Sequence, residues 1–102
     1  MFAYNGKEYE LKFNMERLKL IESSIKTSMI SVIVSTNGSL PVAEMEACFA
    51  YCLKEAGSDT FVPRKEAMKI AQELVEEKGY LEVNNLIIEK LAQDMPFLFR
   101  IA

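Results

Sequence analysis

Polar and apolar residues alternate near the start of the chain and then repeat at helical spacing over most of the rest. Asn5-Gly6 follows a short apolar run, and Tyr9, Leu11 and Phe13 then alternate with charged residues. An Asn-Gly pair readily takes the positive φ angles of a type I′ turn, and alternation with a period of two marks a half-buried strand. The pattern predicts a β-hairpin over residues 1–13. An isolated hairpin is marginally stable in water, so its apolar face must lie on helices or its edge must pair with another chain.

The helical pattern begins at Asn14, which is a suitable N-cap for a helix over about residues 15–24. Glu16 lies in the first turn, where the helix dipole favours a negative charge. Residues 28–36 contain "MISVIVS", whose β-branched side chains leave helix and strand both open. Ser28 is well placed to cap a helix and no partner strand is evident, so we favour helix.

Proline and glycine mark the ends of three further predicted helices. Pro41 and Gly57 bracket the first, Pro63 and Gly79 the second, and Pro96 ends the third, which starts near residue 81. Their apolar residues recur every three or four positions, which predicts one buried face on each of the first two helices. On the third they form a wide apolar band, which indicates contact on more than one side. The residues expected to face inward are Val42, Met45, Phe49, Cys52, Leu53 and Ala56 on the first helix, Ala67, Ile70, Ala71, Leu74 and Val75 on the second, and Val83, Leu86, Ile87, Ile88, Leu91 and Ala92 on the third.

These elements predict an α+β fold, with an N-terminal β-hairpin packed on a bundle of four to five α-helices. A chain of 102 residues, half of them hydrophobic and 26% charged, has ordinary globular composition and can build one core. We expect a single domain over residues 1–102. It divides into the hairpin at 1–13, a helical body at 14–95 and an apolar C-terminal segment at 96–102.

Charge and composition narrow the function classes. The net charge is −3 and the 12 Lys and Arg residues are dispersed, whereas nucleic-acid binding favours a basic field. The chain has no His, and nothing resembles a phosphate-binding Gly-rich loop among its 4 Gly. We therefore expect no enzyme activity, no cofactor and no nucleic-acid partner.

The two cysteines, Cys48 and Cys52, are four residues apart and so share one face of a helix. Two interpretations are open: a pair of small buried apolar groups, which we favour, or half of a metal site. Without His, the remaining ligands would be carboxylates, which are poor partners for thiolates, and we expect no metal. No apolar run approaches the ~20 residues needed to span a bilayer and no signal peptide is evident, which predicts a soluble cytoplasmic protein.

With these function classes set aside, the remaining functional feature of the sequence is apolar surface that could contact another protein. The terminal "MPFLFRIA" carries more apolar area than a frayed chain end should expose to water. It either folds back on the core or docks on a partner, and the hairpin edge is a second candidate for such contact. The residues expected to bind a partner are Phe97, Leu98, Phe99, Ile101, Phe2 and Tyr4.

Two stretches carry a family resemblance. "NGKEYELKFNMERLKLIE" at residues 5–22 resembles the start of small tail assembly chaperones encoded by phages and prophages of Gram-positive bacteria. "FAYCLKEAGSDTFVPRKEAMKIAQELVEEKGYLEVNNLIIEKL" at residues 49–91 is similar to the mostly helical body of such proteins. The shared features are a hairpin turn and patterned helices, so no family binding residue transfers to this chain.

The resemblance implies a non-enzymatic role. Such chaperones bind the tape measure protein and tail tube protein in the cytoplasm of the infected bacterial host. They keep these partners soluble until the tube polymerises, are absent from the finished virion, and often have a longer frameshifted form. The alternative is a phage structural or adaptor protein of the connector or completion type. In either role the hairpin edge and the C-terminal segment would support self-association into a homo-oligomer or docking on an extended helical partner.

Overall fold

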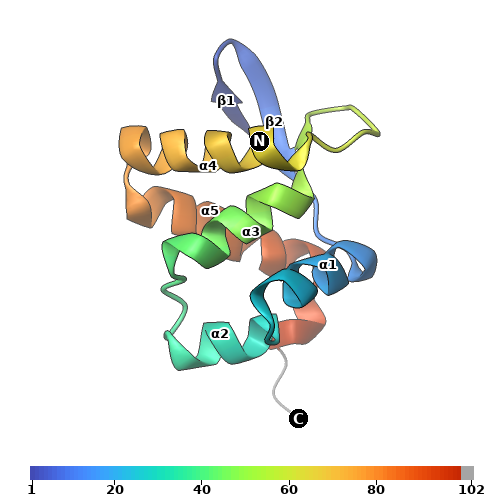
Figure 1. Cartoon of the computed structure of the whole chain (residues 1–102), viewed down its shortest axis with the longest axis vertical. Helices are drawn as coiled ribbons and strands as arrows, with labels where there is room; N and C mark the ends of the chain where they lie inside the picture. Colours follow the sequence, from blue (N-terminus) through green and yellow to red (C-terminus); the bar gives the residue numbers. More distant parts are fainter. Residues whose placement is uncertain (100–102) are drawn as a thin grey trace.

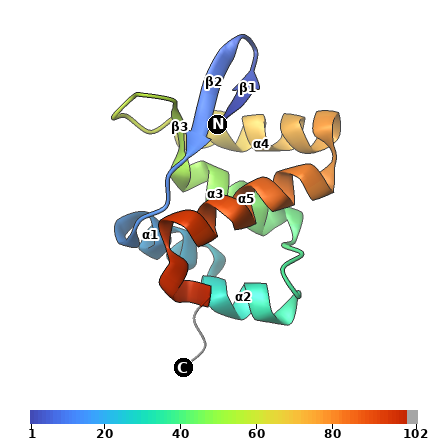
Figure 2. The same ribbon diagram turned by 180° about the vertical axis from the view of Figure 1, so that it is seen from behind.

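The computed structural model describes residues 1–99, which form an α+β fold with the hairpin and helices that the sequence predicts (Figure 1). The fold measures 42 × 28 × 22 Å, with the hairpin at one end and α2 at the other (Figures 1 and 2). The elements in chain order are β1 (Phe2–Tyr4), β2 (Lys7–Leu11), α1 (Met15–Ile25), α2 (Met29–Ser35), α3 (Val42–Cys52), β3 (Leu53–Glu55), α4 (Arg64–Lys78), α5 (Tyr80–Asp94) and the 3₁₀ helix η1 (Pro96–Phe99).

The hairpin forms as its turn residues predict. Asn5 and Gly6 have φ angles of 48° and 77°, the two positive values that a type I′ turn requires. β1 and β2 pair antiparallel, with Tyr4 opposite Lys7 across the turn. Along β2 the alternation holds, because Tyr9 and Leu11 are buried while the charged residues between them stay more exposed.

The helix predicted between Pro41 and Gly57 is wrong over its last four residues. It ends at Cys52, and Leu53–Glu55 forms a third strand that pairs antiparallel with β2. The predicted helical body at residues 14–95 thus contains a strand. The free edge of β2 explains the change, because pairing satisfies its backbone groups: the Lys12 N–H donates to the Cys52 carbonyl at 2.9 Å. The helix propensity of residues 53–56 depends on their neighbours in sequence, so it cannot show that the edge of β2 lies beside them.

Local capping sets the first two helices as predicted. The Asn14 side chain accepts a hydrogen bond from the Arg17 backbone N–H at 2.8 Å. The Ser28 hydroxyl accepts one from the Ser31 backbone N–H at 3.2 Å, and α2 follows directly. Residues 29–35 are therefore helical, because a capped N-terminus is available locally and none of the described strands pairs with them.

The core surrounds α3, which packs against α1, α4 and α5 (Figure 2). Two residues expected to face inward are instead exposed: Val42, at 44% in the first turn of α3, and Ala92 on α5. The central position of α3 widens its buried face, which includes Cys48 at the middle of the helix. The largest fully buried side chains are Phe13, Phe49, Leu11, Ile21, Met29, Leu40, Met45, Leu53, Leu74, Ile87 and Leu91.

Side chains of α5 hold the loop between α2 and α3. The Asn84 amide accepts from the Leu40 N–H at 2.9 Å and donates to the Gly38 carbonyl at 2.8 Å. The Tyr80 hydroxyl donates to the Leu40 carbonyl at 2.5 Å. Farther along α5, the Asp94 carboxylate accepts from the Phe13 N–H at 3.0 Å. These bonds orient α5, which forms one wall of the groove described below.

Candidate protein-binding surfaces

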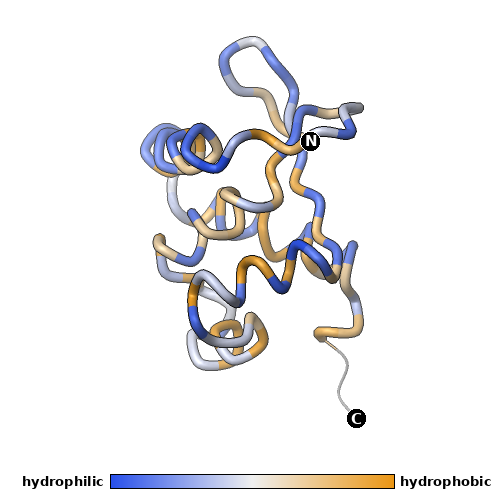
Figure 3. Tube along the Cα trace, turned by 45° about the vertical axis from the view of Figure 1, so that its right-hand side comes forward, coloured by the Kyte–Doolittle hydropathy of each residue, from blue (hydrophilic) through white to orange (hydrophobic). Residues whose placement is uncertain are grey.

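The C-terminal segment folds back on the core in part and stays exposed in part, so both alternatives that the sequence left open apply. Leu98 packs against the core, whereas Phe97 and Phe99 are 45% and 38% exposed. Figure 3 shows the tube becoming hydrophobic in colour as it reaches this end of the described chain. Ile101, also expected to bind a partner, lies outside the described residues. We call Phe97 and Phe99 together the C-terminal patch.

The turn of η1 explains why only one of its three large apolar side chains points inward. Met95 is buried, and its carbonyl accepts a hydrogen bond from the Leu98 N–H at 3.1 Å. This tight turn seats Leu98 on the core and leaves the rings before and after it directed outward. Exposed apolar residues also occur on α2 at the same end of the molecule, where Val34 is 69% exposed (Figure 1).

Phe2 and Tyr4, the two hairpin residues expected to bind a partner, are half-buried and contact the body of the protein or the neighbouring strand. The ring of Phe2 lies 6.0 Å from that of Tyr9 and 6.0 Å from that of Phe49 on α3, measured between centroids. Tyr4 meets Tyr9 edge-on at 6.3 Å. Such ring pairs stabilise the fold by more than the apolar area they bury, so both residues help to hold the hairpin in place.

The sheet offers one free edge among the described strands, that of β1. The outer edge of β3 is already occupied, since the Val62 N–H donates to the Leu53 carbonyl at 2.8 Å and Phe61 bridges to Lys54. β1 has three residues. Its last residue, Tyr4, pairs with Lys7 beside the turn, and Ala3 pairs with Glu8 one step farther along. In an antiparallel ladder that alternation directs the N–H and C=O of Ala3 away from β2. The free edge is therefore short.

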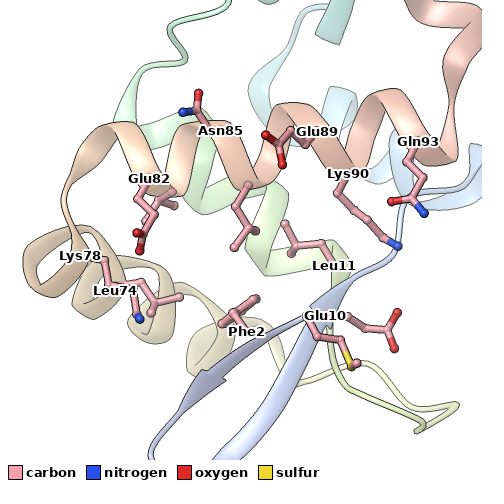
Figure 4. A pocket seen from close by; sticks show the side chains of 13 residues that line it. Phe2, Glu10, Leu11, Leu74, Lys78, Glu82, Asn85, Glu89, Lys90 and Gln93 are labelled. Carbon is pink, nitrogen blue, oxygen red and sulfur yellow. The ribbon is translucent and has the colours of Figure 1, made fainter.

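A groove of about 520 Å³ lies between the hairpin, the end of α4 and one side of α5 (Figure 4). Its floor is apolar, and Phe2 and Leu86 are the half-buried members of that floor. Leu11, Leu74 and Val83 lie beneath them, while the rim is polar and charged apart from the exposed Met1. The rim residues are Glu10, Lys78, Glu82, Asn85, Glu89, Lys90 and Gln93.

The charges on the groove rim fall into two groups. Glu10 and Lys90 are already paired, with Lys54 at 3.9 Å and with Asp94 at 3.6 Å respectively. Lys78, Glu82 and Glu89 form no salt bridge within the part of the chain that the structure describes. Glu82 lies at the same end of the groove as Lys78, and Glu89 lies farther along α5 (Figure 4).

The two cysteines are buried apolar groups. Burial raises the pKa of the Cys48 thiol to about 12, and it also raises the pKa of Cys52. A thiol must ionise to act as a nucleophile or metal ligand, so burial disfavours the reactive form of both at neutral pH. Within residues 1–99 no group of three or more His, Cys, Asp or Glu is placed to hold a metal ion. Over the same residues, no helix has the length and hydrophobicity to cross a bilayer.

Sequence reasoning found the C-terminal patch but missed the groove. Leu86 was assigned to a wide apolar band on the last helix, a width that already indicated contact on more than one side. Glu82 and Glu89 lie four residues before and three after Leu86, so all three share one side of the helix. That spacing was the available signal, but the opposite wall comes from the hairpin, more than 70 residues earlier in the chain.

Comparison of the chain with protein-family models, with curated proteins and with solved structures gave no match. Function is therefore inferred from the surfaces described above and from the resemblance of residues 5–22 and 49–91.

Proposed function

We propose that this protein is a tail assembly chaperone of a phage or prophage of Gram-positive bacteria. In this role it is not an enzyme; it binds the tape measure and tail tube proteins in the host cytoplasm and keeps them soluble during tail assembly. The observation that supports the proposal best is the C-terminal patch. Phe97 and Phe99 are the exposed phenylalanines of a chain that buries or half-buries its other four.

The size of the C-terminal patch suits a contact that must later release. Complete burial of a Phe side chain stabilises a complex by roughly 1.5–3 kcal/mol. Phe97 and Phe99 are already more than half covered, so the two rings together would add about 1–3 kcal/mol on binding. Further contacts must supply the rest, because association itself costs several kcal/mol. Such a site favours reversible binding, which a chaperone needs.

The test is co-expression with a tape measure protein from the same phage or prophage genome. We expect the wild-type chain to keep that protein soluble and to copurify with it. The double variant Phe97→Ser/Phe99→Ser should lower the affinity for it by roughly 5- to 150-fold, the equivalent of about 1–3 kcal/mol. Val34→Ser is the matched control, because Val34 is 69% exposed at the same end of the molecule but outside the patch.

Two outcomes would contradict these expectations. If the wild-type chain leaves the tape measure protein insoluble, the proposed function is wrong. If wild type succeeds and the double variant performs equally well, the C-terminal patch is not the binding surface, although the function stands.

A phage structural or adaptor protein of the connector or completion type is the second candidate. The observation that favours it is the presence of two separate surfaces, the groove and the C-terminal patch, which share no residue. A subunit that bridges two neighbours would use both at once. Such a subunit should copurify with mature particles, whereas a chaperone should be absent from them.

A further inference from the structure

We propose that the groove between the hairpin and α5 binds one amphipathic α-helix of a protein partner, and that this helix carries basic residues two turns apart which face Glu82 and Glu89. The inference rests on the proposed function, since it takes the occupant to be a protein segment. It adds the binding site, the conformation of the bound segment and its charge pattern.

The dimensions of the groove suit one face of a helix. Residues 82–93 of α5 line it, which at about 1.5 Å per residue is a length of about 16 Å, or three helical turns. A helix of that length and about 10 Å across occupies on the order of 1,200 Å³. The groove holds about 520 Å³, so it would accept the apolar stripe while the back of the helix stays in water. The occupant must therefore be amphipathic.

Backbone hydrogen bonding favours a helix over a strand in this groove. The groove is walled by a helix and by a face of the sheet, and Ala3, whose backbone groups mark the free edge of β1, is not among the residues that line it. An extended segment lying there would find no strand edge and would leave its N–H and C=O groups unpaired. A helix pairs its own backbone groups and needs only side-chain contacts, here to Phe2 and Leu86.

The rim sets the charges that the helix should carry. Glu82 and Glu89 are exposed, lie two turns apart on α5, and form no salt bridge within residues 1–99. Lys78, the remaining rim charge without a salt bridge in residues 1–99, belongs to α4, so α5 itself presents only the two glutamates. A partner helix aligned with α5 would place Lys or Arg residues seven positions apart opposite them. Exposed ion pairs add up to about 1 kcal/mol each, so they select the sign and register of the partner while the apolar floor supplies affinity.

The groove is tested with two synthetic helical peptides of about 18 residues labelled with fluorescein. Both carry leucines at helical spacing; one has Lys at the two flanking positions seven apart and its twin has Glu there. Fluorescence anisotropy with the full chain should show binding of the Lys peptide and at least tenfold weaker binding of the Glu twin. Leu86→Glu should weaken binding of the Lys peptide at least tenfold. The double variant Glu82→Lys/Glu89→Lys should bind the Glu twin more tightly than the Lys peptide.

Leu81→Glu is the matched control, because Leu81 lies on the same helix, is 69% exposed and does not line the groove. The inference is overturned if both peptides bind wild type equally, or if Leu86→Glu binds like wild type. It is also overturned if Leu81→Glu causes the same loss while circular dichroism shows both variants folded.

The co-expression assay with the tape measure protein separates this inference from the proposed function. Loss of solubilisation by Leu86→Glu and retention by Leu81→Glu would support the groove as the working site. If wild type binds the Lys peptide but fails to solubilise the tape measure protein, the function is wrong and the groove stands. If it solubilises that protein but binds neither peptide, the groove inference is wrong and the function stands.

Discussion

Asn84 is the one polar residue that the core encloses in residues 1–99, and both ends of its amide are used. One end accepts from the Leu40 N–H and the other donates to the Gly38 carbonyl, across more than 40 positions of sequence. A buried donor or acceptor that loses its partner costs more than the bond contributed, because it has also lost its water. Asn84 therefore fixes the loop between α2 and α3 on α5.

Replacing this amide should be costly. We expect Asn84→Ala to lower the free energy of unfolding by about 2–4 kcal/mol, since the Leu40 N–H would be left buried without an acceptor. Urea denaturation followed by circular dichroism measures the change. The control is Asn85→Ala, an exposed residue on the same helix, which should shift stability by less than about 0.5 kcal/mol. Equal effects of the two substitutions would show that the Asn84 bonds are not stabilising.

At the scale of elements, β3 explains how a two-stranded hairpin is stable at the start of a helical protein. The register places Leu53 of β3 opposite Leu11 of β2, and both side chains are buried. A three-stranded sheet with one apolar face on helices meets the condition that an isolated hairpin does not. The hairpin is thus held by an element that sequence reasoning assigned to a helix.

The turn of the hairpin should be sensitive to backbone conformation alone. Gly6 has φ of 77°, and a Cβ placed there would meet nothing within 4 Å. Gly6→Ala should therefore lower the free energy of unfolding by about 1–2 kcal/mol through left-handed strain only. Gly6→Asn should cost less, because Asn tolerates that region. Chemical denaturation measures the free energy of unfolding of both variants. An Asn variant less stable than the Ala variant would contradict this explanation.

At the scale of the whole molecule, the hairpin and the helices share one core. Phe2 of β1 contacts Phe49 of α3, while Tyr9 and Leu11 of β2 belong to the same buried cluster as Leu91 of α5. Within residues 1–99, no polar layer separates the apolar residues of the sheet from those of the helices. The two parts should therefore lose structure together.

We expect one cooperative unfolding transition. The chain has no Trp, so near-ultraviolet circular dichroism would report its 4 Tyr, two of which lie in the hairpin, while the far-ultraviolet signal reports the helices. The two signals should give the same urea midpoint. An earlier tyrosine transition would mean that the hairpin detaches before the bundle melts, contrary to the shared core.

The sequence by itself determined the elements whose causes are local. The turn residues Asn5-Gly6, the caps at Asn14 and Ser28 and the proline and glycine boundaries of α4 specified where the hairpin and most helices form. It also identified the C-terminal segment as unusual, because Phe97, Leu98 and Phe99 are adjacent large apolar residues. Turns, caps and periodicity act over a few residues, which is why a linear reading finds them.

Only the tertiary structure decided which surfaces remain for a partner. Leu53 became part of a strand because β2 offered an edge. Leu98 packs on the core while Phe97 and Phe99 stay exposed, because the tight turn of η1 directs only one of the three side chains inward. The groove exists because the hairpin is carried to α5 by the packing of everything between them. Such contacts join residues that are far apart in the chain, and their energy depends on the whole fold.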